Sequence, residues 1–153
     1  MTDPVTINPR IIDALYSEAL VLSDEVRAAF MLSGRIETAG REEDLARIAL
    51  SCEALRTTTR MMHAIAWLLN HRAYFMGELS EFQLRRHGRL AQESAAAEPD
   101  RLALLDPEVR VLIGATERFY ARLMRLDCGW REHDVQAPSA IAALRERIRM
   151  ASR

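Results

Sequence analysis

Histidines and cysteines are the residues of this chain best suited to hold a metal ion or to act as a base or nucleophile. Their spacing fits neither the HExxH pattern of zinc peptidases nor the Glu-x-x-His pairs of carboxylate di-metal sites. We therefore expect no metal site and no cofactor. The residues concerned are His63, His71, His87, His133, Cys52 and Cys128.

Other catalytic devices are also missing from the sequence. The six glycines form no phosphate-binding loop, and no serine stands in a nucleophile-elbow context. All 21 basic residues are arginine, which excludes a Schiff-base lysine and a P-loop lysine. His63 lies in a mostly apolar segment, which is more typical of a core or interface histidine than of a general base. The sequence predicts that this protein is not an enzyme.

Composition and charge indicate a single domain. A chain of 153 residues is long enough to bury a real core. The formal net charge of −1 gives no simple electrostatic attraction to nucleic acid or to a membrane surface. The start at Met1–Pro4 does not resemble a signal peptide, and the nearly apolar run Met61–Leu69 is too short to span a bilayer. We expect a cytoplasmic protein in which Cys52 is a reduced core thiol.

A repeat of non-charged, mostly apolar positions spaced three or four residues apart runs through residues 45–76. Such spacing keeps one side of a helix against a partner helix, turn after turn. No glycine or proline interrupts the repeat before Gly77, so we expect one helix of about nine turns. We call these positions the apolar seam; they are Leu45, Ile48, Cys52, Leu55, Thr59, Met62, Ala66, Leu69, Ala73 and Met76.

Two further long helices have clear start signals. Asn8–Pro9 provides an N-cap followed by proline in the first turn, and apolar periodicity continues to Ser33–Gly34. Asp106–Glu108 has the same form, a cap, a proline and an acidic residue at the positive end of the helix dipole. We expect this third long helix to end near Cys128–Gly129.

The connections set the predicted architecture. The loop 34–40 is short, and short loops join antiparallel neighbours. Ser80–Gln83 has the form of a capping box and predicts a short helix before the third long one. The sequence thus predicts an all-α fold: an elongated antiparallel three-helix bundle with a short extra helix between the second and third long helices. A short C-terminal helix is indicated by Ile141, Leu144 and Ile148.

We expect two parts along the chain. Residues 1–128 would form the three-helix bundle domain. Residues 129–153 contain a charge-rich stretch and the break at Pro138, which indicate a flexible C-terminal tail.

The predicted helix lengths bear on assembly. The second long helix has about 36 residues and the first about 25, so at 1.5 Å per residue they differ by about 15 Å. The overhanging end of the second helix is apolar around much of its circumference, and a second copy of the chain would bury it. The alternative is a monomer whose short helix folds back over the overhang. The candidate dimer-interface residues are Ile65, Trp67, Leu68, Phe75 and Met76.

A row of arginine and aromatic residues lies opposite the apolar seam on the same predicted helix. One interpretation is a binding surface for an acidic partner or a nucleotide phosphate. The other is structural pairing within the fold, in which acidic residues of the first helix (Asp13, Glu18, Asp24 and Glu25) neutralise Arg56 and Arg60. The candidate partner-binding residues are Arg56, Arg60, His63, Trp67 and Tyr74.

The central segment resembles a known family. The block Ser51–Met62 (SCEALRTTTRMM), followed by Ala66–Leu69, Arg72–Ala73 and Gly77–Glu78, is similar to the alphaproteobacterial RcdA family, regulators of CtrA degradation. Supporting segments lie in the first and third long helices, so the resemblance covers about residues 10–128. These segments are Asp13–Ala19, Phe119–Arg122 and Arg125–Asp127.

This resemblance implies a three-helix bundle, usually dimeric, that acts as a non-enzymatic adaptor in regulated proteolysis. Such adaptors help deliver cell-cycle response regulators and other cargo to the Clp unfoldase–protease, together with a single-domain response regulator. Two alternatives stay open: a helical transcription-regulatory or nucleic-acid-associated protein, and a purely structural dimer. The near-neutral charge and the lack of helix-turn-helix spacing argue against nucleic acid as the partner.

Overall fold

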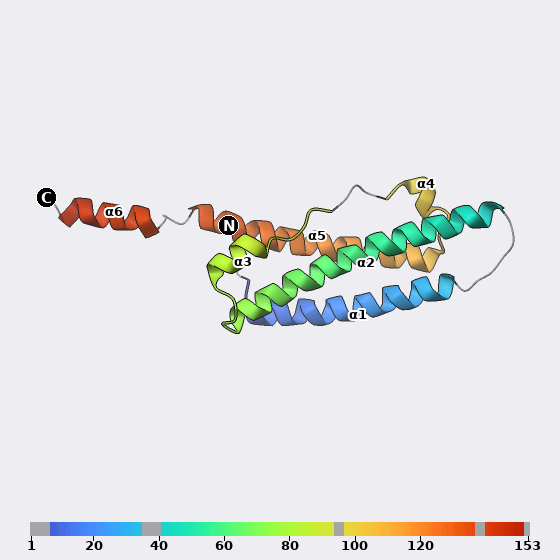
Figure 1. The fold of residues 1–153 in the computed structure, drawn as a ribbon, viewed down its shortest axis with the longest axis horizontal. Coiled ribbons are helices and arrows are strands. Elements are labelled where there is room, and N and C mark those ends of the chain that lie inside the picture. Colours follow the sequence, from blue (N-terminus) through green and yellow to red (C-terminus); the bar gives the residue numbers. More distant parts are fainter. Residues whose placement is uncertain (1–6, 35–40, 94–96, 137–139, 152–153) are drawn as a thin grey trace.

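The computed structural model describes residues 7–34, 41–93, 97–136 and 140–151. These residues form helices and connecting segments and contain no β-strand, which confirms the predicted all-α class (Figure 1). The helices are α1 (Pro9–Ser33), α2 (Arg41–Phe75), α3 (Glu81–His87), α4 (Pro99–Leu102), α5 (Pro107–Gln136) and α6 (Ala140–Ala151).

Local side-chain chemistry sets several helix ends where the sequence predicted them. The Asn8 side chain accepts a hydrogen bond from the backbone N–H of Ile11 at 3.0 Å and caps α1. The predicted capping box opens α3, since Ser80 and Gln83 each accept a hydrogen bond from the other's backbone N–H. Gly77, two residues after the end of α2, has φ of 80°, a left-handed conformation that favours glycine.

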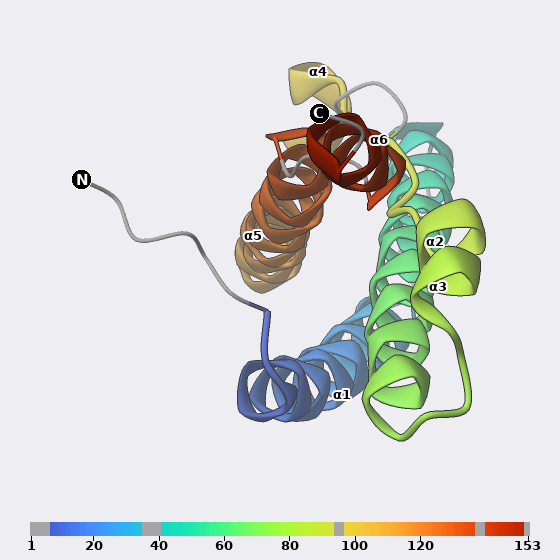
Figure 2. The same cartoon turned by 90° about the vertical axis from the view of Figure 1, so that its left-hand side faces the viewer.

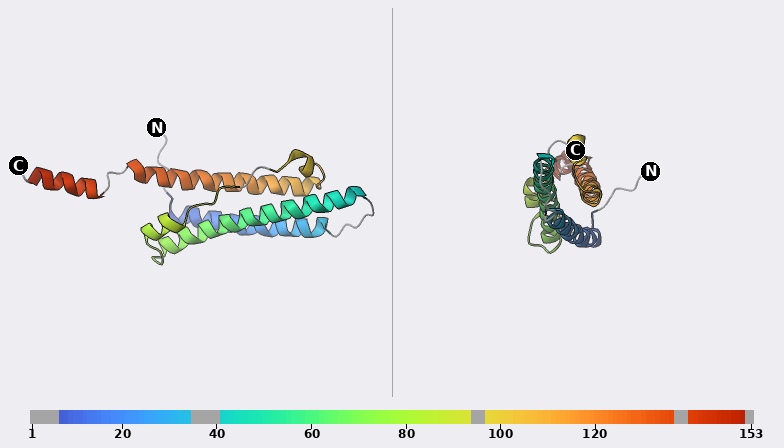
Figure 3. Two further views of the ribbon diagram at one scale, coloured as in Figure 1. Left: turned by 45° about the horizontal axis from the view of Figure 1, so that its top comes forward. Right: turned by 90° about the vertical axis from the view of Figure 1, so that its right-hand side faces the viewer.

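The three long helices α1, α2 and α5 pack against one another, and seen end-on they occupy the corners of a triangle (Figure 2). Helix α1 is antiparallel to both of the others, whereas α2 and α5 run in the same direction (Figures 1 and 3). The prediction of an entirely antiparallel arrangement is therefore wrong for this pair. The reason is that the chain runs back along the bundle after α2, by way of α3 and α4, before α5 begins. We call residues 88–93, which follow α3, the returning chain.

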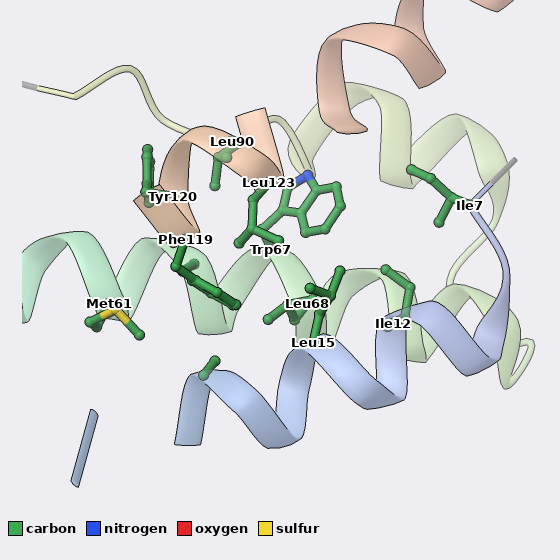
Figure 4. Close-up of a cluster of buried hydrophobic side chains, with 12 residues drawn as sticks. Ile7, Ile12, Leu15, Met61, Trp67, Leu68, Leu90, Phe119, Tyr120 and Leu123 are labelled. Carbon is green, nitrogen blue, oxygen red and sulfur yellow. The ribbon is translucent and has the colours of Figure 1, made fainter. Parts of the chain in front are cut away.

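The main core lies where these three helices meet. Its side chains come from α1, α2 and α5, and Leu90 of the returning chain closes one side (Figure 4). A smaller cluster around Ala49 and Val109 lies towards the other end of the bundle. The central side chains of the main cluster are Ile12, Leu15, Ala19, Met61, Ala64, Trp67, Leu68, Phe119, Tyr120 and Leu123.

Helix α5 continues past its predicted end at Cys128–Gly129 and reaches Gln136. The indole of Trp130 explains the continuation, because it packs on the core with its ring 5.3 Å from that of His71. The Arg85 guanidinium also lies 4.2 Å from the Trp130 ring centroid, a cation–π contact. These contacts offset the cost of placing Gly129 inside a helix, which is about 1 kcal/mol relative to alanine. The predicted domain boundary at residue 128 therefore falls inside a helix.

Candidate protein-interaction surface

The apolar seam of α2 faces away from the core. Leu55 is 70% exposed, Met62 64% and Met76 69%, and Leu45, Ile48 and Leu69 are exposed as well. Cys52 is half-buried and not a core thiol. The predicted periodicity and helix are thus present, but no other helix of the described chain covers this side.

The inward side of α2 carries several polar side chains among its apolar ones. Glu53 and Thr57 are fully buried, and His71 is 1% exposed. Neither carboxylate oxygen of Glu53 accepts a hydrogen bond from the described residues, and its closest ion-pair contact is Arg56 Nε at 3.7 Å. Polar residues inside and apolar residues outside are the reverse of the usual pattern for a surface helix.

Arg60 is one of these buried polar residues, and its charge is neutralised inside the chain. It forms ion pairs with Glu93 of the returning chain and with Glu117 of α5. Its Nη1 also donates a hydrogen bond to Thr116 Oγ1 at 2.9 Å. Structural pairing of Arg60 therefore occurs, but its partners are not the acidic residues of α1 that the sequence suggested.

The acidic residues of α1 pair with other arginines. Asp13 lies 3.0 Å from Arg72 near the end of α2, and Glu18 pairs with Arg122 of α5. Asp24 pairs with an arginine of its own helix. These contacts tie α1 to both other long helices.

The candidate partner-binding row is only partly accessible. Arg60 is 6% and Trp67 2% exposed, so neither can contact another protein as the structure has them. His63 is exposed, and Arg56 and Tyr74 are half-buried. These three side chains remain candidates.

Part of the candidate dimer interface is also buried within a single chain. Trp67 and Leu68 lie in the core of a single chain, where no second copy can reach them. Ile65 and Phe75 are half-buried and pack against that core, and Met76 is exposed. Helix α1 begins beside the end of α2, so the predicted overhang is absent there (Figure 1). That end of α2 is covered by α1, α5 and the returning chain, and the accessible apolar surface lies on the seam.

Two hollows flank the seam. A hollow of about 310 Å³ lies on the α1 side, lined mainly by apolar side chains that include Phe30, Met31 and Met61. A second, of about 240 Å³, lies on the side of the returning chain and includes Arg56 and His63. Hollows beside an exposed apolar row allow large side chains of a partner to anchor.

Asp127 fastens the returning chain to the bundle. It is 2% exposed and accepts hydrogen bonds from Trp67 Nε1 at 3.0 Å, from the Leu90 backbone N–H at 3.3 Å and from Arg131 Nε at 3.1 Å. The Tyr120 hydroxyl donates to the backbone carbonyl of Ala91. Burial raises the pKa of Tyr120 to about 12, so this donor stays protonated. The α5-facing side of α2 is closed by these contacts, and its seam is left open.

His71 makes the stability of the fold depend on pH. Burial lowers its pKa from 6.5 to about 4, although the nearby Asp127 carboxylate partly opposes this shift. Between pH 6.5 and 4 the unfolded chain then binds more protons than the folded one. We expect the free energy of unfolding to fall by up to about 3 kcal/mol as the pH is lowered from 6.5 to 4.

Urea denaturation between pH 7 and pH 4 measures this effect. His71→Phe should lose the His71 contribution to the pH dependence, whereas His87→Gln, a change at an exposed histidine, should retain it. Identical pH slopes for wild type and His71→Phe would mean that His71 is not buried as a neutral group.

Among the described residues, two other features are absent: a metal site and a membrane-spanning helix. No cluster of three or more His, Cys, Asp or Glu residues there has the geometry to hold a metal ion. Among the same residues, no helix combines the length and the apolar character needed to cross a membrane.

The fold and its surface define an all-helical protein with an uncovered apolar seam. The sequence model of a family described as "Protein of unknown function (DUF1465)" matches residues 4–152. The chain therefore belongs to the DUF1465 family. No curated protein and no solved structure matches it. The family description assigns no activity.

Proposed function

We propose that this chain is a non-enzymatic, protein-binding adaptor in Clp-type regulated proteolysis of cell-cycle regulators. It works in the cytoplasm as a homodimer of three-helix bundles joined through the apolar seam. The protein-binding part of this proposal rests on one observation: the apolar seam of α2 faces outward.

The length and spacing of the seam fit a partner helix. From Leu45 to Met76 it extends for about 46 Å at 1.5 Å per residue. Spacings that alternate between three and four residues are those of coiled coils. Covering an exposed Leu or Met side chain stabilises a complex by about 1.5 to 3 kcal/mol, so a seam of this length favours association over exposure to water.

The Clp context comes from the resemblance of Ser51–Met62 and the segments after it to the RcdA family. This block supplies both sides of α2: Leu55 and Met62 belong to the seam, while Thr57 and Arg60 face inward. A single segment of sequence therefore determines both the inner packing of the bundle and the surface that it presents.

The nucleic-acid alternative has weaker support. Arg60 is buried in ion pairs with Glu93 and Glu117, and Arg56 lies 3.7 Å from Glu53. Among its described side chains, helix α2 therefore presents no continuous row of exposed arginines to a phosphate backbone.

Cross-linked affinity purification from an alphaproteobacterial lysate, read by mass spectrometry, tests the proposal. Wild-type bait should recover the Clp unfoldase together with a response regulator. The double variant Leu55→Glu/Met62→Glu should recover about tenfold less of both. Val111→Glu is the matched control, because Val111 is 66% exposed but lies on α5.

If the wild-type bait recovered no other protein, the adaptor role would be contradicted, and the structural dimer would be the remaining interpretation. Equal recovery by wild type and the seam variant would show that binding of these partners depends neither on the seam nor on the dimer formed through it.

A further inference from the structure

A groove between α1 and α5 lies on the side of the bundle away from α2. In the end-on view, α2 occupies one corner of the triangle and the α1–α5 side faces away from it (Figure 2). The groove has a volume of about 760 Å³, within the range of about 300 to 1,000 Å³ typical of binding sites. Leu22, Ala115 and Phe119 contribute its apolar lining.

The two helices give the groove rims of opposite charge. Three arginines of α5 (Arg118, Arg122 and Arg125) line one rim, and Glu18 and Glu25 of α1 line the other. Because 118, 122 and 125 follow the spacing of a single helix face, the three guanidinium groups form a row.

The central arginine of the row is already engaged. Arg122 donates a hydrogen bond to Glu18 across the groove, and its guanidinium lies 5.2 Å from the Phe119 ring centroid. This pair neutralises one charge on each rim. In the described residues, Arg118 and Arg125 make no ion pair, which leaves two exposed arginines against Glu25.

We propose that this groove docks an amphipathic helix of another protein that carries acidic residues seven positions apart. Arg118 and Arg125 are seven residues apart, or about 10.5 Å along α5, and acidic residues at the same interval on a helix lying along α5 would meet both. The apolar side of that helix would cover Leu22, Ala115 and Val21, which also lines the groove and is 60% exposed. Arginine favours such contacts because its planar group binds carboxylates through two hydrogen bonds.

The position of the groove distinguishes it from the seam. The seam lies on the outward face of α2 and the groove between the other two long helices, so both surfaces can be occupied at once. The docking surface does not depend on the proposed role in proteolysis, since it is argued from α1 and α5 alone.

Fluorescence anisotropy with a designed peptide tests the groove. The probe is a fluorescein-labelled helical peptide of about 18 residues, with leucines at i, i+4, i+7 and i+11 and glutamates seven positions apart on one flank. A second peptide carries lysines in place of the glutamates. We expect the acidic peptide to bind wild-type protein about tenfold more tightly than the basic peptide.

Arg118→Glu/Arg125→Glu should weaken binding of the acidic peptide by about tenfold or more and improve binding of the basic one. Arg110→Glu is the matched control, an exposed arginine of α5 outside the groove, and should leave both affinities within about twofold. Circular dichroism confirms that each variant is folded. Equal affinity for the two peptides, or an unchanged affinity in the double variant, would overturn the proposal. So would weakening by Leu55→Glu/Met62→Glu instead, since that result would place the peptide on the seam.

Discussion

Replacing Asp127 with alanine is expected to lower the free energy of unfolding by about 3 to 5 kcal/mol. The carboxylate is buried and accepts hydrogen bonds from Trp67, Leu90 and Arg131, so its removal leaves three donors without an acceptor. One of these donors carries a full charge. A buried donor that loses its partner costs about 1 to 3 kcal/mol, and more when it is charged.

Thermal and urea denaturation with Asp127→Ala and Asp127→Asn measure this effect. Asparagine keeps one oxygen acceptor but cannot satisfy all three donors, so its loss should be smaller than that of alanine. Asp24→Ala is the matched control, because Asp24 pairs with Arg27 in full solvent and its loss should cost less than about 1 kcal/mol. If Asp127→Ala and Asp24→Ala were equally stable, Asp127 would not be the fastening point of the returning chain.

The second large effect is expected at the seam. Leu55→Glu combined with Met62→Glu should weaken self-association by about 100-fold or more, because two carboxylates would have to be buried in the middle of the interface. Both side chains are largely exposed in the single chain, so the fold itself should keep nearly its full stability.

Sedimentation equilibrium distinguishes the two effects, with circular dichroism as the measure of folding. The wild type and Val111→Glu should sediment as dimers and the double variant as a folded monomer. A monomeric wild type would remove the homodimer from the proposed function. A double variant that stayed dimeric would place the interface on another face of the bundle.

Local sequence signals predicted the helix ends well. Asn8, the capping box at Ser80 and Gly77 each act within one turn of the chain, so their effect does not depend on distant partners. The end of α5 is the exception. Gly129 indicated a stop, but the packing of Trp130 against His71 and Arg85 depends on residues far away in the sequence.

The face of α2 that would be buried was predicted wrongly for a related reason. Periodicity identifies which residues share a side of a helix, but it does not show what covers that side. Arg60 belongs to the row opposite the seam, which one interpretation made a binding surface, whereas it is buried and finds its charge partners in Glu93 and Glu117. The α1–α5 groove was missed because its arginines and glutamates lie on helices whose mutual orientation only the structure provides.

The same long-range contacts determine the order in which the protein can assemble. Trp67 and Asp127 are 60 positions apart, so their contact closes a long loop, and closures of this kind slow folding. Helices α1 and α2 are joined by a short connection and can pair first. During synthesis at the ribosome, the α5-facing side of α2 would then stay in water until residue 127 has emerged, in addition to the seam, which is exposed throughout. A newly made chain is therefore a stronger target for chaperones than the finished bundle.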